Sequence, residues 1–338
     1  MRVMRVIVAL VIALALGGGL GLAALGERWR AFAWAAALPT VVVVGAFVSP
    51  WIVLGGCLVV GMGAMVDTFR TAYREDTRLR ILSPWPWLVL VFEIAAALAL
   101  RMFVVEAFYI PSSAMYPTLH IGDHVFVEKL TKLVRAPKRG ELAVFVYPCD
   151  PDRDYVKRVV AVGGDSVEMR CDVLYVNGEA VPSRLVEDAA HCAYEDYDEL
   201  ADRWSPRKCT RFHEALQGTD YDVYDEDDAA PRERPSARDF PRRDEPPPSC
   251  ANVPEDRYSK VEQSPGKLVE TKPAGSAKPC EPQLQYVVPE GELFVLGDNR
   301  YNSNDSRVWG TLPVANVKGR PTMIWLSKRE PGRIGAVR

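Results

Sequence analysis

The sequence lacks the short motifs that mark the commonest metal and hydrolase sites. It contains no CxxC pair, no HExxH and no GxSxG, and histidine occurs only 4 times in 338 residues. These absences argue against a zinc site and against a nucleophile elbow with a Ser-His-Asp triad. The net charge of −3 provides no global basic field. We therefore expect neither a bound metal ion nor a nucleic-acid partner.

Long apolar runs dominate the first third of the chain. Val3–Leu25 and Trp85–Val105 each have about the length needed to cross ~30 Å of hydrocarbon. A cleaved secretory signal is the alternative for Val3–Leu25, but its length and the apolar runs that follow favour a retained span. We expect residues 1–105 to form a membrane region of three to four spans, the last at 85–105.

Between these runs, Ala31–Val66 is too long for one ordinary span. Pro39 and Pro50 interrupt it, so it favours two helices, near 31–48 and 50–66. A single tilted and kinked helix is the alternative.

The loop at Asp67–Pro84 predicts the orientation of the last span. It carries Arg70, Arg74, Arg78 and Arg80. Arginine-rich short loops stay in the cytoplasm, so the span that follows runs outward and delivers Ile110 to the outer face.

The cysteines support this placement independently. Cys57 lies in an apolar run, and the other six cysteines all follow the last span, at 149, 171, 192, 209, 250 and 280. An even number on one side of a membrane indicates disulfides in an oxidising compartment, and unpaired thiols in a reducing one are the alternative. Six cysteines allow 15 connectivities, and their spacing does not choose among them.

The part beyond the last span alternates apolar and polar residues as strands do. Candidate strands are His124–Leu130, Glu141–Tyr147, Tyr155–Val162, Ser166–Arg170, Val173–Val176, Leu284–Val288, Glu292–Leu296 and Val317–Leu326. Asn177-Gly178 is a strong hairpin signal. We expect a mostly β domain built from residues 106–182 and 284–330.

The segment 183–283 separates the two groups of strands. It holds 23 acidic against 15 basic residues, and 12 of the 26 prolines. Its low hydrophobicity, with an acidic run at Asp225–Asp228, argues against a packed core over much of it. We expect a long, partly disordered insertion that contains four of the cysteines.

Three motifs follow one another in the β domain. Ile110–Asp123 reads IPSSAMYPTLHIGD, Asp154–Arg158 reads DYVKR, and Gly297–Arg307 reads GDNRYNSNDSR before Trp309-Gly310. A lysine such as Lys157 serves as a base only when burial or positive neighbours destabilise its ammonium, and Val156, Val159 and Val160 are suitable neighbours.

Together these motifs resemble the type I signal peptidases, over residues 85–182 and 284–326. The resemblance implies that Lys157 is the catalytic base and that Ser303 orients its amine. It implies an oxyanion site formed by the Ser112 hydroxyl and the backbone N–H of residue 114. Four residues near the site have structural roles: Asp305 and Arg307 as an ion pair, and Gly297 and Asn299 for tight turns and close backbone approach.

The nucleophile position departs from the family, because Ala114 stands where the resemblance requires serine. The chain is then an ordinary signal peptidase changed at one residue, or a natural pseudopeptidase that binds signal peptides without cleaving them. As a third interpretation Ser113 attacks instead, although a shift of one residue turns the side chain toward the opposite face.

The resemblance also implies fold, location and partners. It predicts N-terminal transmembrane helices and a mostly β catalytic domain on the extracytoplasmic side of the cell (inner) membrane, in a multi-pass protein. It implies cleavage of signal peptides from exported preproteins by a Ser/Lys dyad, with no cofactor. The expected partners are preprotein signal peptides and the lipid bilayer, with the secretion machinery as a further candidate.

Overall fold

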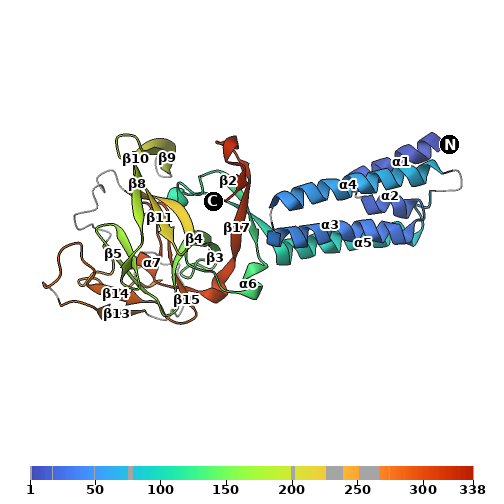
Figure 1. Ribbon diagram of the computed structural model, residues 1–338. Coiled ribbons are helices and arrows are strands. Elements are labelled where there is room, and N and C mark those ends of the chain that lie inside the picture. Colours follow the sequence, from blue (N-terminus) through green and yellow to red (C-terminus); the bar gives the residue numbers. More distant parts are fainter. Residues whose placement is uncertain are drawn as a thin grey trace. The chain divides into compact units, whose positions relative to one another are not determined.

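A computed structural model describes the chain except for residues 1, 17, 49, 75–78, 199–201, 226–238, 251–265, 274 and 338. The chain forms two compact units (Figure 1). The first, the helical unit, comprises residues 1–106 and 128–130, and the second, the β unit, comprises 107–127 and 131–338. Arg78 and the acidic residues 226–228, on which expectations above rest, lie outside the described residues.

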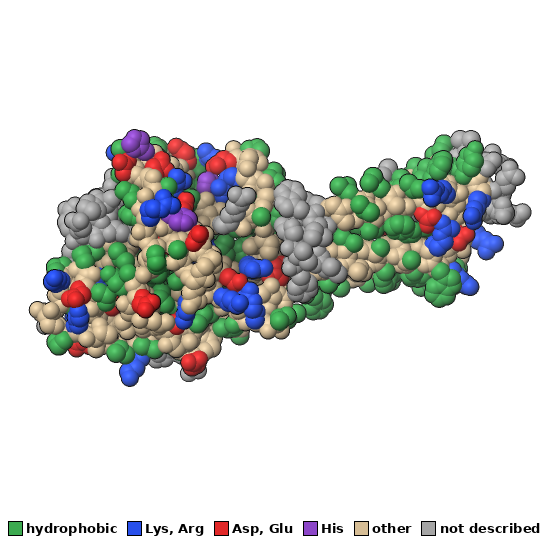
Figure 2. Space-filling model, in the orientation of Figure 1, with side chains coloured by type: hydrophobic (Ala, Val, Ile, Leu, Met, Phe, Trp, Pro, Cys, Tyr) green, Lys and Arg blue, Asp and Glu red, His purple; other side chains and the backbone are tan. Residues whose placement is uncertain are grey.

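The helical unit consists of α1 (Arg2–Leu16), α2 (Gly18–Ala24), α3 (Arg28–Val48), α4 (Pro50–Tyr73) and α5 (Pro84–Ala99), which a π-helical turn extends through Leu100–Val104. In the described part of the chain, one helix is both long and apolar enough to cross a membrane, the 21 residues Pro84–Val104, and 11% of its 18-residue apolar window is buried. Its start is favoured by prolines in the first turn, where no hydrogen-bonding N–H is needed. Hydrophobic side chains extend along the visible face of the helices (Figure 2).

The expectation of one continuous span over Val3–Leu25 is wrong. The chain forms two helices there, and α2 packs against α1. A Cβ added at Gly21 of α2 would lie 2.8 Å from the Ala13 Cβ of α1, whereas eight residues of one straight helix would separate these positions by about 12 Å. Gly18 and Gly19 lie at the start of α2, where glycine is tolerated better than in the interior of one long helix. By contrast, helices are present at both segments expected near 31–48 and 50–66, as α3 and α4.

Strands are present at all eight expected segments. They are β2 (Asp123–Glu128), β3 (Leu142–Val146), β4 (Asp154–Val162), β5 (Ser166–Arg170), β6 (Val173–Val176), β14 (Leu284–Val287), β15 (Glu292–Leu296) and β17 (Val317–Ser327). The structure adds four strands that were not expected, β1 (Val105–Tyr109), β7 (Glu179–Ala180), β16 (Leu312–Pro313) and β18 (Gly335–Ala336), and the short helices α6 (Thr131–Val134) and α7 (Ser306–Trp309). One sheet has the order β1-β2-β17-β3-β4-β15-β16, with β18 paired to β17. Another has the order β13-β14-β5-β6-β7, where β13 is Lys267–Glu270.

Strands β4 and β15 are buried on both faces. Val159 of β4 contributes to one apolar cluster with Leu293 and Val295, and Val160 contributes to another with Phe294 and Leu296. Successive side chains of a strand point to opposite faces, so these strands separate the two clusters. Two-sided burial makes the middle of the sheet a rigid base for the side chains that β4 carries.

The expected hairpin at Asn177-Gly178 is present between β6 and β7. Both residues have positive φ, 56° and 80°, as a two-residue turn of this kind requires.

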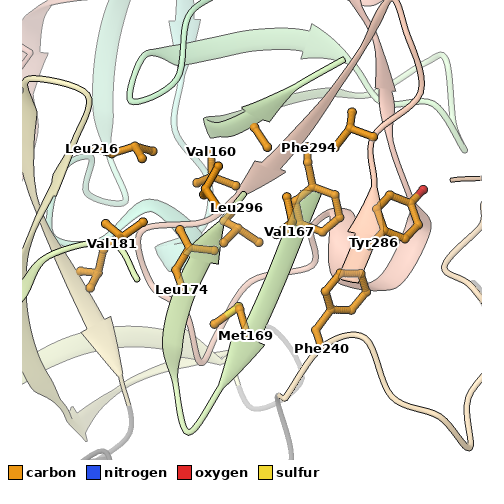
Figure 3. Close-up of a cluster of buried hydrophobic side chains, with 14 of the residues drawn as sticks. Val160, Val167, Met169, Leu174, Val181, Leu216, Phe240, Tyr286, Phe294 and Leu296 are labelled. Atoms are coloured by element: carbon orange, nitrogen blue, oxygen red, sulfur yellow. The ribbon is translucent and has the colours of Figure 1, made fainter. Parts of the chain in front are cut away.

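The expectation that the insertion largely lacks a packed core is wrong for its described strands. β8 (Ser183–Glu187), β11 (Thr210–Leu216) and β12 (Thr219–Asp225) form a sheet of order β12-β11-β8, and β9 (Ala193–Asp198) pairs with β10 (Arg203–Lys208). Figure 3 shows Leu216 and Phe240 of the insertion in one cluster with Val160 and Phe294 of the main sheet. The composition of residues 183–283 hides this core, because its alternating apolar positions are few and lie among many charges.

The six cysteines that follow the last apolar run are paired in disulfides. Within the described residues they join Cys149 to Cys250, Cys171 to Cys280, and Cys192 to Cys209. The first two attach the insertion to the main β domain. The third lies within the insertion and closes the β9–β10 hairpin.

Candidate active site

The segment that carries residue 114 is a single 3₁₀ turn, Ser113–Met115, after an extended Ser112. Met115 and Leu119 anchor it, because both are almost fully buried in a cluster with Val125 and Val127 of β2. The backbone N–H of Leu119 donates to the Met115 carbonyl at 2.9 Å. This apolar anchoring fixes the turn, so the side chains on either side of Ser113 have defined directions.

Ser112, Ala114 and Lys157 line one cleft of about 500 Å³. The apolar part of its lining is Phe108, Ile110, Met115, Val144 and Val156. The structure therefore brings the first two motifs together in a single cavity, although 43 positions separate Ala114 from Lys157 in the sequence. Ser113 is not among the residues that line this cleft.

Lys157 lies on β4 opposite Ala143 of β3, and only 4% of it is exposed. Burial lowers its pKa to about 8, because the charged ammonium loses its hydration. The Asp305 carboxylate opposes this shift and the Arg307 guanidinium adds to it. Among the described residues, the amine makes no hydrogen bond. A buried lysine in this state has a much larger neutral fraction near neutral pH than an exposed one.

The third motif meets the first through Gly297 and Asn299. A Cβ added at Gly297 would overlap the Ser303 hydroxyl and would lie 2.5 Å from the Ala114 carbonyl oxygen. The Asn299 backbone N–H donates to that carbonyl at 3.1 Å, and its side-chain amide donates to the Ser113 carbonyl at 3.2 Å. Only glycine allows this close approach of two loops at position 297.

The Ser303 hydroxyl lies beside Gly297 and is inaccessible to solvent. No described residue, Lys157 included, forms a hydrogen bond with the Ser303 Oγ. A buried hydroxyl without a partner is uncommon and costs free energy of the order of 1–3 kcal/mol. A hydrogen bond to the Ser303 hydroxyl would therefore be stabilising, and the Lys157 amine could form it after a rotamer change.

Asp305 and Arg307 form the ion pair that the resemblance implied. Arg307 donates to both carboxylate oxygens of Asp305, each at 2.8 Å. The Asp305 carboxylate also accepts from the backbone N–H of Gly297 at 3.1 Å. Burial alone would raise the pKa of Asp305, but Arg307 and Lys157 hold it below its ordinary value. The pair thus joins α7 to the loop that contacts residue 114.

Sequence reasoning missed two buried ion pairs beside this loop. Arg158 donates to both oxygens of Asp298, at 2.7 and 2.6 Å. Arg300 donates to both oxygens of Glu214, at 3.2 and 2.6 Å. Glu214 comes from β11 of the insertion, and nothing in its local sequence indicates this partner.

The insertion contacts the site at two further places. Asp196 of β9 accepts hydrogen bonds from Ser113 and Asn302. The backbone of Tyr224 on β12 exchanges hydrogen bonds with that of the 297–300 loop, accepting from Arg300 and donating to Asp298, both at 2.8 Å. The insertion is therefore part of the wall that supports the site.

Comparisons with known proteins identify the family of this chain. Residues 85–326 match the family model described as "Signal peptidase, peptidase S26". The chain is 32% identical over 244 residues to signal peptidase I of Aquifex aeolicus, covering 70% of this chain and 82% of that protein. It is 30% identical over 257 residues to signal peptidase I of Pseudomonas aeruginosa, covering 69% of each.

A crystal structure of a signal peptidase I from Enterococcus faecalis matches 55% of this chain and 97% of that chain, at 22% identity and a TM-score of 0.23. We draw no argument about the fold from so low a score. The family match over most of the chain and the relatives at 30% identity or more are decisive. The chain belongs to the signal peptidase family of S26 peptidases.

Proposed function

We propose that this chain has the substrate site and the general base of a membrane-bound signal peptidase I, which cleaves signal peptides from exported preproteins. Signal peptidase I proteins are serine endopeptidases. The observation that carries the proposal is the cleft shared by Ser112, residue 114 and the buried Lys157. With Ala114 the attacking oxygen is absent, so the chain as written binds a signal peptide and does not cleave it.

Lys157 is the base of the proposed dyad. With a pKa of about 8, roughly one tenth of the lysine is neutral at pH 7, compared with less than about one thousandth for a lysine of ordinary pKa. A serine at position 114 would transfer its proton to this amine as it attacks the scissile carbonyl, and the amine would return the proton to the leaving nitrogen. Ser303, buried beside Gly297, supplies the hydroxyl that orients the amine.

The oxyanion of the tetrahedral intermediate is stabilised by two donors, the Ser112 hydroxyl and the backbone N–H of residue 114. The position of Ser112 in the cleft lining supports its part in this assignment. The apolar lining suits small apolar substrate side chains next to the scissile bond. Asp305, Arg307, Gly297 and Asn299 hold the loop that supports these groups.

Ser113 is poorly placed to replace the missing nucleophile. Its side chain is 97% buried, and its hydroxyl donates to the Asp196 carboxylate at 2.6 Å. Attack by Ser113 would require this hydrogen bond to break and the 3₁₀ turn to reverse its side-chain directions. This contact favours an inactive chain over one that cleaves through Ser113.

In the membrane we propose a multi-pass arrangement in which α3, α4 and α5 with its π turn cross the bilayer. They have 21, 24 and 21 residues, each enough for about 30 Å. The start of α3, the end of α4 and the start of α5 meet at one end of the unit: Arg30 contacts Asp67, and the Arg28 guanidinium lies 5.2 Å from the Trp85 ring centroid.

That end also carries Arg70, Arg74 and Arg80. The positive-inside rule therefore assigns it to the cytoplasm, and α5 runs outward to the β unit. The β domain proposed from 106–182 and 284–330, with its insertion at 183–283, then lies on the extracytoplasmic side of the cell membrane. Anchoring in the bilayer raises the local concentration of signal peptides, whose apolar helices occupy the same membrane.

The test is cleavage of a purified preprotein in detergent by three forms of the chain. These are the chain as written, its Ala114→Ser variant, and Ala114→Ser/Lys157→Ala. We expect cleavage by Ala114→Ser alone, and binding of the preprotein without cleavage by the chain as written. Cleavage by the chain as written would overturn the assignment of position 114. Failure of Ala114→Ser to cleave, despite preprotein binding, would overturn the assignment of Lys157 as a working base and would favour a natural pseudopeptidase over a peptidase changed at one residue.

A further inference from the structure

The insertion reaches the segment of residue 114 through one carboxylate. Asp196 Oδ1 accepts from the Ser113 hydroxyl at 2.6 Å, and Asp196 Oδ2 accepts from the Asn302 side-chain amide at 2.9 Å. The same amide donates to Ser113 Oγ at 2.9 Å. Three side chains from three separate segments therefore form a closed triangle at the edge of the cleft, which Asn302 also lines.

Asp196 is held on a braced element. It lies on β9, which pairs with β10 from Ala193↔Lys208 to Asp198↔Arg203. The Cys192–Cys209 disulfide closes the open end of this hairpin. On the same hairpin, the Tyr194 ring packs edge-on against the Tyr116 ring, with centroids 5.3 Å apart. The disulfide thus braces the hairpin itself, and the ring contact holds the hairpin against the segment of the 3₁₀ turn.

The side chains of the turn alternate in direction. Ser112 and Ala114 line the cleft, whereas Ser113 is buried on the other side against Asp196. Neighbouring residues in this turn face different ways. Holding the Ser113 side chain against Asp196, away from the cleft, therefore also keeps residues 112 and 114 directed into the cleft. Misplacing a reacting group by about 1 Å can reduce a rate roughly 100-fold.

We propose that Asp196 is a positioning residue for the cleavage reaction, acting through Ser113 and Asn302 on the directions of Ser112 and residue 114. This inference rests on the proposed function and extends it to the insertion. The part played by Asp196 is to accept two hydrogen bonds at once, which a carboxylate does and an alanine cannot.

The kinetic test uses Ala114→Ser as the reference enzyme. We expect Asp196→Ala to lower kcat roughly 10- to 100-fold with KM nearly unchanged, and Ser113→Ala to act in the same direction. The double variant should be no worse than the more damaging single one, because both remove the same hydrogen bond.

Asp196→Asn, which keeps one acceptor for Ser113, should restore part of kcat. Glu195→Ala, an exposed carboxylate on the same strand, is the matched control and should keep the reference rate.

A second measurement does not depend on cleavage. Hydrogen exchange of the peptide 110–119 is compared between the chain as written and its Asp196→Ala and Glu195→Ala variants. We expect faster exchange in Asp196→Ala only. Unchanged exchange, or additive losses of kcat in the double variant, would overturn the inference. If Ala114→Ser does not cleave, but exchange of the peptide 110–119 is faster in Asp196→Ala, the result would count against the proposed function alone.

Discussion

Arg300 and Glu214 form an ion pair in which each side chain is 1% exposed. Arg300 belongs to the loop beside residue 114, and Glu214 belongs to β11 of the insertion. The Arg300 Nε also donates to the Gly297 carbonyl at 3.1 Å. One buried guanidinium therefore connects the insertion to the glycine that touches the nucleophile segment.

Removing the charge from Glu214 should destabilise the β unit. In Glu214→Gln the Arg300 guanidinium stays buried and loses the carboxylate that it pairs with, which costs about 3–5 kcal/mol of unfolding free energy. Urea denaturation of the two forms measures this. Glu187→Gln is the matched control, since Glu187 pairs with Arg211 with about a third of each side chain exposed, and we expect a change below about 1 kcal/mol. Equal effects of the two variants would contradict a stabilising role of the buried pair.

Cleavage by the Ala114→Ser variant should rise with pH and level off near pH 8. Burial lowers the pKa of Lys157 to about 8, and only the neutral amine accepts the serine proton. Below pH 8 the neutral fraction, and with it kcat/KM, grows about tenfold per pH unit, and above pH 8 it saturates. The profile is measured from pH 6 to pH 10. A rise that continued to pH 10 would indicate an unshifted lysine, and a plateau from about pH 6.5 would indicate a histidine base.

Substituting Gly297 should impair both packing and catalysis. An alanine methyl group would overlap Ser303 Oγ and press on the Ala114 carbonyl. We expect Gly297→Ala to cost about 1–3 kcal/mol of unfolding free energy and to abolish most cleavage in the Ala114→Ser background. Gly332→Ala, where an added Cβ meets nothing within 4 Å, provides the control. Full activity of Gly297→Ala would show that the two loops separate more easily than the structure indicates.

Peptide mapping without reduction should recover one connectivity among the 15 possible. We expect disulfide-linked peptides that join Cys149 to Cys250, Cys171 to Cys280, and Cys192 to Cys209. The Cβ atoms of the first two pairs are close only if the insertion folds back onto the main β domain, and those of the third are close only if β9 pairs with β10. A reduced and alkylated sample serves as the control. Any exchange of partners between the pairs would contradict the fold of the insertion described above.

Much of the β domain could be predicted from local patterns. The alternation of β14 and β17 and the Asn177-Gly178 turn identified strands that the structure contains, because strand periodicity and turn chemistry are encoded in neighbouring residues. The helical region was harder, since hydropathy does not show where a long apolar run folds back. The two packed helices of Val3–Leu25 were therefore not predicted.

The sequence by itself determined the family, the order of its three motifs, and the identity of residues 114, 157 and 303. These are local strings, so they are visible without a fold. Only the tertiary structure decided that Lys157 is buried beside the cleft, that Ser113 faces away from it, and that Asp196 and Glu214 support it. The residues in these last contacts lie 83 and 86 positions apart in the chain. No local pattern records such pairs, because they arise only when the insertion packs against the sheet and buries its few apolar side chains.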